Sequence, residues 1–436
     1  MSNKKFSFFK KNDNNKEKNT DRRFAKISKT LSNYFSAEPE KEKVLRYEDF
    51  DAAGDTYYAS VSAWYKVFQR VCLVALAVFS VVSVTVNFKH ITYDNFFYLI
   101  KDFNTAVDTE SVRYETLSYD ASADQSFALY RGGLAVISRS NVSAFTATGR
   151  RTLNSNSSYS KPFAVTSDKY LLVYDIGDGN MAIYNSFAKV YSEKLDYPIS
   201  DACFSDEGNF AVLTRSEKYE SEIIVYDKNF KKLINYRKGS FAVDIALSPD
   251  GERLGALYCD TDNGIICTKM VLYDIGKQEK IDELVYSGEF PLAFTFLDGG
   301  GFAAVTDTKV RIFDKLYREQ AESDSYFSGL VSAVWCDNEY AAVAFNNGIT
   351  SDTNKVIVFD KKGELVYNDV IRSDVSQFAV CGGYFFVKNT LGVSRIKLED
   401  GTTESLECQD GKMLVYDAST VLVCAEAKAV YLNFDD

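Results

Sequence analysis

A short apolar run that ends in an aromatic residue and a polar residue recurs along the chain from residue 142 onward. The markers of these runs are Phe145, Tyr184, Tyr226, Tyr273, Phe313, Phe359, Ile396 and Tyr431, of which the last two belong to weaker copies. Successive markers are 39, 42, 47, 40, 46, 37 and 35 residues apart. The mean step of about 41 matches the length of one four-stranded blade of a β-propeller. The pattern therefore predicts a series of blades.

A second pattern marks the first strand of each unit. In six of the eight units an alanine stands four residues before a turn residue, and these alanines are Ala128, Ala164, Ala202, Ala246, Ala333 and Ala379. Strands nearest a propeller axis converge, so a small side chain is expected there. The unit around Ala293 has one extra residue before Asp298, and the last unit has Met413 in place of the alanine.

The two ends of the repeat region complete each other. The eighth unit ends at Phe434 without an outer strand, whereas the segment from Ser111 to Ser118 precedes the first inner strand. That segment would supply the missing strand and leave no exposed sheet edge. We predict an all-β, eight-bladed β-propeller over residues 111–436, with seven blades as the alternative because the last two units are short.

An uncharged stretch of 18 residues, Val71 to Phe88, precedes the repeats. A helix needs about 20 apolar residues to cross a bilayer core, and the Arg70 side chain can reach the interface. We predict a transmembrane signal-anchor helix over residues 66–88; the alternative is a core helix or a buried strand pair. Residues 1–65 are then a largely disordered cytoplasmic tail, and residues 89–110 a juxtamembrane linker.

Charge divides the chain at the same stretch. Residues 1–70 hold 15 Lys and Arg against 10 Asp and Glu, whereas the chain from residue 88 onward holds 35 against 51. Basic residues favour the cytoplasmic side of a membrane. We therefore expect a single-pass protein of the cell membrane, with its N-terminus in the cytoplasm and its propeller extracellular. The acidic balance argues against a nucleic-acid partner, whose phosphates would be repelled.

The segment from Asp244 to Gly251 (DIALSPDG), followed by an apolar strand, resembles the WD40-like and YVTN-type propeller repeats of bacteria. The arrangement over residues 45–436 resembles the single-pass, membrane-anchored proteins of unknown function of Gram-positive bacteria. This resemblance implies an extracytoplasmic propeller and no defined activity, because such motifs specify a fold rather than a chemistry. The Gly-His and Trp-Asp dipeptides of eukaryotic WD40 repeats do not occur in the sequence.

The sequence offers little catalytic chemistry. Its one histidine, His90, precedes the repeats, which excludes His-based metal clusters and argues against a His-activated nucleophile. Trp335 is the one tryptophan of the repeats, unlike in quinone-cofactor propellers, and no spacing marks a glycosidase carboxylate pair. Cysteine spacing is irregular, although Cys259 and Cys267 flank one hairpin and could meet across it. We predict no catalytic residue, no metal ligand and no cofactor.

Three long connections between second and third strands are expected on the face where the chain enters the inner strands: Thr214 to Glu222, Tyr258 to Thr268, and Phe345 to Lys355. Loops on a rigid scaffold commonly bind ligands. The candidate binding residues at their tips are Arg215, Lys218, Tyr219, Asp260, Asp262, Asn263, Asn346, Asn347 and Asp352. We predict a binding scaffold or sensor for an envelope protein, peptide or glycan. The alternative is an envelope enzyme, glycosidase-like or quinoprotein-like, that uses acidic residues of this face.

Overall fold

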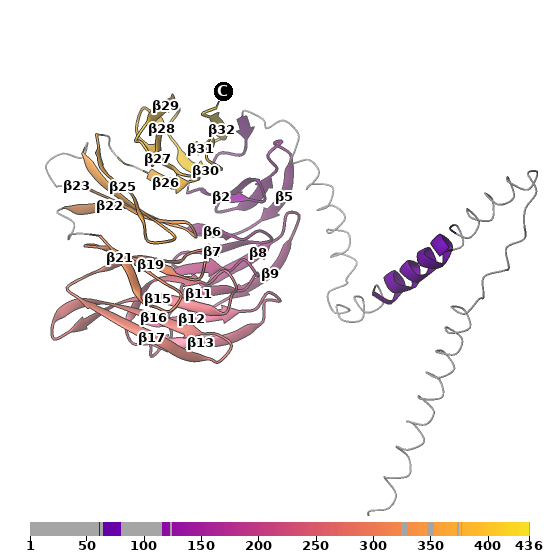
Figure 1. Ribbon diagram of the computed structural model, residues 1–436, viewed down its shortest axis with the longest axis horizontal. Helices are drawn as coiled ribbons and strands as arrows, with labels where there is room; N and C mark the ends of the chain where they lie inside the picture. The colour runs from indigo at the N-terminus through magenta and orange to yellow at the C-terminus, as the bar shows by residue number, and fades with distance from the viewer. Residues whose placement is uncertain are drawn as a thin grey trace, which may run out of the picture. The chain divides into compact units, whose positions relative to one another are not determined.

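The computed structural model describes residues 61, 64–79, 116–122, 124–323, 329–346, 353–372, 375 and 377–435. From Thr116 onward the described residues form 32 strands and no helix. The strands make eight four-stranded antiparallel sheets arranged as a ring (Figure 1). The predicted all-β, eight-bladed propeller is confirmed, and the seven-bladed alternative is wrong.

Each blade runs outward from an inner strand, and the inner strands of successive blades contact one another. The inner strands of blades 1 to 8 are β2 (Ser126–Tyr130), β6 (Pro162–Thr166), β10 (Asp201–Phe204), β14 (Phe241–Leu247), β18 (Pro291–Phe296), β22 (Leu330–Cys336), β26 (Gln377–Cys381) and β30 (Lys412–Val415). The second strands are β3 (Gly133–Ile137), β7 (Leu171–Asp175), β11 (Phe210–Thr214), β15 (Arg253–Asp262), β19 (Phe302–Thr306), β23 (Tyr340–Asn346), β27 (Tyr384–Lys388) and β31 (Thr420–Cys424).

The third and outer strands complete the sheets. The third strands are β4 (Asn141–Phe145), β8 (Asn180–Tyr184), β12 (Ser221–Tyr226), β16 (Ile265–Asp274), β20 (Val310–Phe313), β24 (Asn354–Asp360), β28 (Gly392–Lys397) and β32 (Lys428–Asn433). The outer strands are β5 (Arg151–Asn156), β9 (Lys189–Lys194), β13 (Lys232–Lys238), β17 (Glu279–Ser287), β21 (Glu319–Glu322), β25 (Leu365–Ile371), β29 (Thr403–Glu407) and, in blade 8, β1 (Thr116–Ser118).

The N-terminal strand β1 closes the ring. It pairs antiparallel with β32, with Leu117 opposite Ala429. Leu117 is 2% exposed and packs into the cluster between blades 8 and 1, while the Tyr119 hydroxyl donates a hydrogen bond to the Ala425 carbonyl. The predicted closure between the two ends of the repeat region is thereby confirmed.

The hydrophobic core is divided among the joints of the ring. Eight clusters of buried side chains lie one between each pair of neighbouring blades. The second strands pack against a neighbour on both faces, and those of blades 1, 2, 3, 5 and 8 are buried throughout. Apolar burial stabilises by about 25 cal/mol per Å². This stabilisation is therefore spread around the ring rather than gathered at its centre.

The alanines of the second sequence pattern lie on inner strands, but not at one common position. In each sheet the marker residue on the third strand pairs with a residue of the second strand, and that residue pairs in turn with one residue of the inner strand. These inner residues are Phe204 in blade 3, Leu247 in blade 4 and Cys336 in blade 6. Ala202 stands two residues before Phe204, Ala246 stands one residue before Leu247, and Ala333 stands three residues before Cys336. The turns that follow the inner strands differ in length, so equal spacing from a turn is not equal placement.

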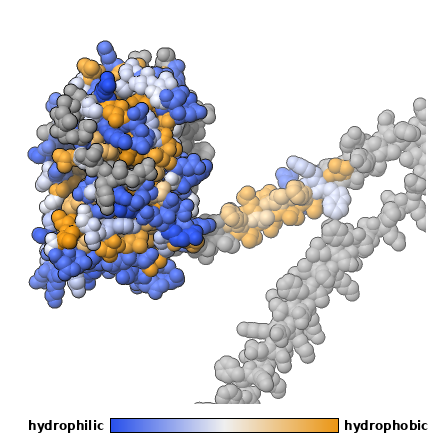
Figure 2. All heavy atoms as spheres, turned by 60° about the vertical axis from the view of Figure 1, so that its left-hand side comes forward, coloured by the Kyte–Doolittle hydropathy of each residue, from blue (hydrophilic) through white to orange (hydrophobic). Residues whose placement is uncertain are grey.

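A separate helix covers residues 64–79, and all of its described residues are exposed. Its surface is mostly hydrophobic, with Phe79 72% exposed (Figure 2). The expected span over residues 66–88 continues beyond this helix into residues outside the described ones. Among the described residues, no helix combines the length and the apolarity that crossing a membrane requires. The expected linker over residues 89–110, and the expected tail apart from residues 61, 64 and 65, also lie outside the described residues.

Candidate functional site

The connections between second and third strands, together with those between blades, emerge at the same ends of the sheets because all the sheets are antiparallel. We call the surface they form the loop face. In blade 3 the Arg215 guanidinium lies 5.7 Å from the centroid of the Tyr197 ring, which places a cation against an aromatic face. Lys218 and Tyr219 are exposed nearby in the same connection, so all three predicted residues of this loop are accessible.

The second predicted loop, Tyr258 to Thr268, is not a loop. Strands β15 and β16 remain paired as far as Asp262 and Ile265 and turn at Asn263 and Gly264, whose φ angles are 51° and 82°. The Asn-Gly dipeptide is a strong signal of a two-residue hairpin turn, and here it marks a long hairpin. Asp262 and Asn263 are exposed at its tip.

Asp260 is a paired strand residue rather than a free loop carboxylate. Its Oδ2 accepts hydrogen bonds from Lys269 Nζ and from Ser240 Oγ, both at 2.6 Å. These bonds, that from Lys269 first, lower the pKa of Asp260 well below its usual range. In the third predicted loop, Asn346 ends β23, whereas Asn347 and Asp352 lie outside the described residues. The candidate residues thus fall on blades 3, 4 and 6.

An apolar patch around blade 4 was not predicted; it consists of Phe241 on β14, Ile266 on β16 and Phe290 in the connection to β18, which are 57%, 47% and 40% exposed. Phe241 pairs with Cys259, and Cys259 pairs with Thr268. Paired residues share a sheet face, as do residues two apart on one strand, so Ile266 lies on this same face. We call these residues the blade-4 patch. The adjacent Ile265 and Ile266, directly after an Asn-Gly turn, were the sequence signal for exposed apolar side chains.

A buried ion pair holds the segment that carries Phe290. Arg311 Nη1 and Nη2 lie 2.7 Å and 2.6 Å from the two carboxylate oxygens of Glu289, and both side chains are about 5% exposed. Thr306 also donates to Glu289, and Thr268 donates to its backbone carbonyl. Burial alone would raise the pKa of Glu289, but the bonds from Arg311 and Thr306 lower it. The patch therefore rests on a fixed support.

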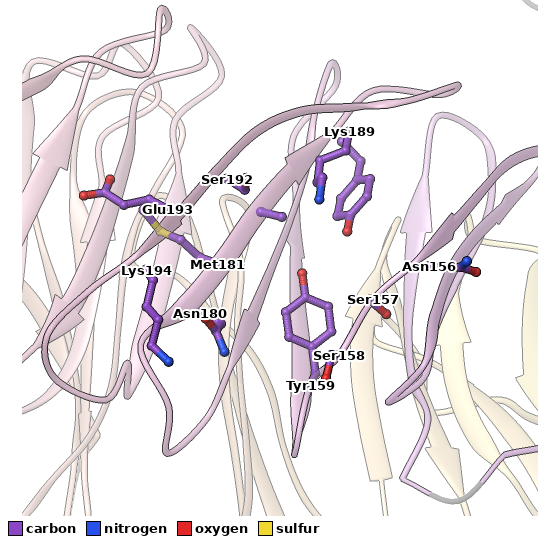
Figure 3. A pocket seen from close by; sticks show the side chains of 12 residues that line it. Asn156, Ser157, Ser158, Tyr159, Asn180, Met181, Lys189, Ser192, Glu193 and Lys194 are labelled. Atoms are coloured by element: carbon purple, nitrogen blue, oxygen red, sulfur yellow. The ribbon is translucent and has the colours of Figure 1, made fainter.

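A cleft of about 420 Å³ lies between blades 1 and 2 beside the loop face. Residues 156–159, at the end of β5 and in the connection that follows, form one side, and strands β8 and β9 form the other. Figure 3 shows Ser157 and Tyr159 on one side of this cleft, and Asn180 and Ser192 on the other. This cleft was not predicted, because it is formed by segments of two blades that no sequence motif links.

Two charged groups of the cleft are already paired. Glu193 is bound by Lys232 Nζ at 2.6 Å and accepts bonds from the hydroxyls of Tyr191 and Tyr226. Lys194 Nζ lies 3.8 Å from an Asp178 carboxylate oxygen.

The polar side chains on the other side of the cleft differ in their partners. Burial, followed by a hydrogen bond with Tyr184, raises the pKa of Tyr159 far above its usual range, so its hydroxyl stays protonated. Within the described residues, the buried Ser157 Oγ has no hydrogen-bond partner.

The enzyme alternative called for carboxylates that converge near the axis, and one such pair exists. Asp201 and Asp244, on the inner strands of blades 3 and 4, are hydrogen-bonded to each other. Both also accept bonds from backbone N–H groups. Glycosidase carboxylates stand about 5–9 Å apart to admit a sugar bond and water. A pair in direct contact leaves no room for them, so its arrangement is structural.

The described cysteines do not add a further centre. All eight are thiols, including Cys259 and Cys267, which lie on opposite faces of the β15–β16 hairpin because Cys259 pairs with Thr268 and Cys267 with Asp260. Burial raises the pKa of the Cys259 thiol and so reduces its reactivity. Among the described residues, no group of three or more His, Cys, Asp or Glu side chains is placed to hold a metal ion.

Comparison with known proteins agrees with this architecture. The family model "Family of unknown function (DUF5711)" matches residues 105–414. The crystal structure of the computationally designed Ika8 protein aligns with a TM-score of 0.53 at 12% identity, over 74% of this chain and 100% of that one. This likeness shows the fold alone.

Two further structures are similar at lower scores. A eukaryotic initiation factor gives a TM-score of 0.49 at 13% identity, over 70% of this chain and 83% of that one. The Pan2 WD40 domain of Neurospora crassa gives 0.44 at 13% identity, over 62% and 90%. No curated protein matches the chain.

Proposed function

This chain belongs to the DUF5711 family, and we propose that it is a membrane-anchored, extracytoplasmic propeller that serves as a binding scaffold or sensor for an envelope protein, peptide or glycan. The β-propeller fold itself suggests a binding or scaffold role. Its anchor would be the helix at residues 66–88. The uncharged stretch from Val71 to Phe88 and the excess of basic residues before it support this topology.

The blade-4 patch is the observation that carries the proposal. Three large apolar side chains are exposed around the extended hairpin, one on β14, one on β16 and one in the connection to β18, and the hairpin tip adds the polar groups of Asp262 and Asn263. An apolar centre with a polar rim is the usual composition of a protein interface. We propose that an envelope protein or peptide with an apolar segment docks here, on the side of blade 4 that faces blade 5.

A photoreactive residue at position 266 tests the docking surface in intact cells. We expect it to cross-link one recurring partner, whereas the same residue at position 316, an exposed leucine on the opposite face, does not. The double variant Ile265→Ser, Ile266→Ser should lose this partner without a change in Tm. Equal cross-linking from both positions, or capture retained by the double variant, would contradict the docking surface.

Epitope tags at the two ends test the topology separately. In intact protoplasts we expect an antibody to reach a C-terminal tag but not an N-terminal one. Permeabilisation should make both tags accessible. The reverse pattern would refute the proposed orientation.

A further inference from the structure

We propose that the cleft between blades 1 and 2 binds an acidic saccharide. This inference deepens the proposed function by naming a ligand class, and it rests on that function for the extracellular supply of the ligand. Binding itself depends only on the cleft.

The cleft has the size and position of a ligand site. Its volume of about 420 Å³ lies within the 300–1,000 Å³ typical of small-molecule sites. One wall consists of strands β8 and β9 of blade 2, which packs against blade 1 through the cluster that contains Tyr184 and Ala182. The other wall is the end of β5 and the connection that follows it. A wall formed by rigid strands loses little entropy when a ligand binds.

The hydrogen-bonding groups of the cleft suit a ligand rich in hydroxyls. Serine hydroxyls and asparagine amides from both blades line it, and each can donate and accept. Ser157 Oγ is buried without a partner within the described residues. Leaving such a group unsatisfied costs about 1–3 kcal/mol. Rotation about the Cα–Cβ bond of Ser157 would present the hydroxyl to a ligand. The Tyr159 ring offers an apolar surface of the size of one sugar ring.

The charges of the cleft favour an anion. The Glu193 carboxylate is neutralised by Lys232 and points away from Tyr159 (Figure 3). Lys189 extends toward Tyr159 in the same view, and within the described residues it has no carboxylate partner. Lys194 lies at the other end of β9, and its side chain is 68% exposed. The uncompensated positive charge therefore lies next to the hydroxyls, which is the pairing that a sugar carboxylate requires.

Apolar ligands fit the cleft less well. Its only aliphatic lining side chains are Met181 and Ala182, and both are almost fully buried in the packing of blade 2. A lipid tail or an apolar peptide would leave the serine and asparagine groups without partners. These unsatisfied groups would weaken its binding.

Calorimetry on the full-length protein in nanodiscs tests the assignment, with tetragalacturonate as the acidic probe and maltotetraose as the neutral one. We expect saturable binding of tetragalacturonate that weakens as salt rises, and at least tenfold weaker binding of maltotetraose. Lys189→Gln should lower the affinity for tetragalacturonate about tenfold, because it removes one charge-assisted bond. Ser157→Ala should lower it about fivefold by the loss of a neutral bond.

Matched variants control for general effects of charge and folding. Lys228→Gln removes an exposed lysine on the opposite face, and Ser216→Ala removes a hydroxyl in another connection; both should bind as the wild type does. All variants should keep the wild-type Tm. Equal affinity for the two probes, no saturable binding, or wild-type affinity in Lys189→Gln would overturn the proposal.

The two proposals fail in different ways. Tetragalacturonate binding together with a cytoplasmic C-terminal tag would refute the proposed location and leave the cleft assignment standing. An extracellular tag with a cleft that binds neither probe would refute only the saccharide site.

Discussion

The Asp244 carboxylate accepts a hydrogen bond of 2.7 Å from the backbone N–H of Phe294, and this bond joins the inner strand of blade 4 to that of blade 5. The equivalent residue of blade 3, Asp201, accepts from Ile245 in blade 4 at 3.3 Å. In blade 7, Gln377 accepts from Met413 in blade 8 at 2.7 Å. A side chain at the same inner-strand position thus links neighbouring blades at three joints, and at two of them it is a half-buried carboxylic acid.

Asp244→Asn should make the stability of the propeller less dependent on pH. Burial, together with the charge of Asp201, raises the pKa of Asp244 well above its usual value. The folded state then holds a proton that the unfolded state releases above about pH 4, so the free energy of unfolding falls as pH rises from there through the folded pKa. Asparagine carries no such proton and can still accept from Phe294. Thermal unfolding between pH 5 and 9 measures the difference.

Asp262→Asn is the control for this prediction, since Asp262 is exposed at the hairpin tip. It should unfold with the pH dependence of the wild type. If the curves of Asp244→Asn and the wild type ran parallel, the Asp201–Asp244 pair would not be the source of the dependence.

Gly255→Ala should destabilise the joint between blades 4 and 5. A Cβ atom at Gly255 would lie 2.0 Å from Phe294 Cε1, inside the cluster formed by the two blades. Such overpacking typically costs about 1–3 kcal/mol. Urea unfolding should show this loss, and the loss should shrink when the same substitution is made in a Phe294→Ala background.

Gly239→Ala is the matched control, because no atom lies within 4 Å of a Cβ placed there. We expect its stability to stay within about 0.5 kcal/mol of the wild type or to rise slightly. An equal loss at both glycines would mean that backbone entropy, and not the Phe294 ring, sets the cost.

Arg311→Leu should cost about 3–5 kcal/mol of stability, because it leaves the buried Glu289 carboxylate without its partner. The same change should weaken capture through the blade-4 patch, since Glu289 precedes Phe290. Chemical unfolding and cross-linking from position 266 measure the two effects. Arg318→Leu, which breaks the exposed pair with Asp314, should cost about 1 kcal/mol or less. Similar losses in both variants would contradict the importance of burial.

Leu117→Ala should loosen the seam between the first and last strands. Leu117 is 2% exposed, and truncation of such a leucine typically costs about 2–5 kcal/mol. Hydrogen exchange should accelerate first in β32, the partner of β1. Thr116→Ala, at an exposed position of the same strand, should change both readouts little. Uniform acceleration across all blades would indicate that the ring opens elsewhere.

The blades were predictable from sequence because their markers sit on buried third strands, where an aromatic or large aliphatic side chain fills a joint between blades. Closure by the segment that holds β1 was predictable because the eighth unit lacks an outer strand. The different positions of the alanines on their inner strands were not predictable, since register depends on turn length, which pattern spacing does not reveal.

The site was less predictable for a different reason. Asp260 was expected as a free loop residue, but its partner Lys269 became visible only once the hairpin register was known. The cleft joins Ser157 of one blade to Lys189 of the next, and neither residue carries a motif. Surfaces formed between repeats are set by packing, whereas a repeat pattern describes each unit alone.

Closure by β1 also fixes an order of events during synthesis. The Tyr119 hydroxyl and the Ala425 carbonyl that it binds are 306 residues apart in the chain. At about 5–20 residues per second, the first strand must wait roughly 15–60 s for its partner to be made. During that interval, blades 1 to 7 can form in turn while the joint between blades 8 and 1 stays open. A chaperone that shields the first strand would therefore act on the nascent chain, before the ring exists.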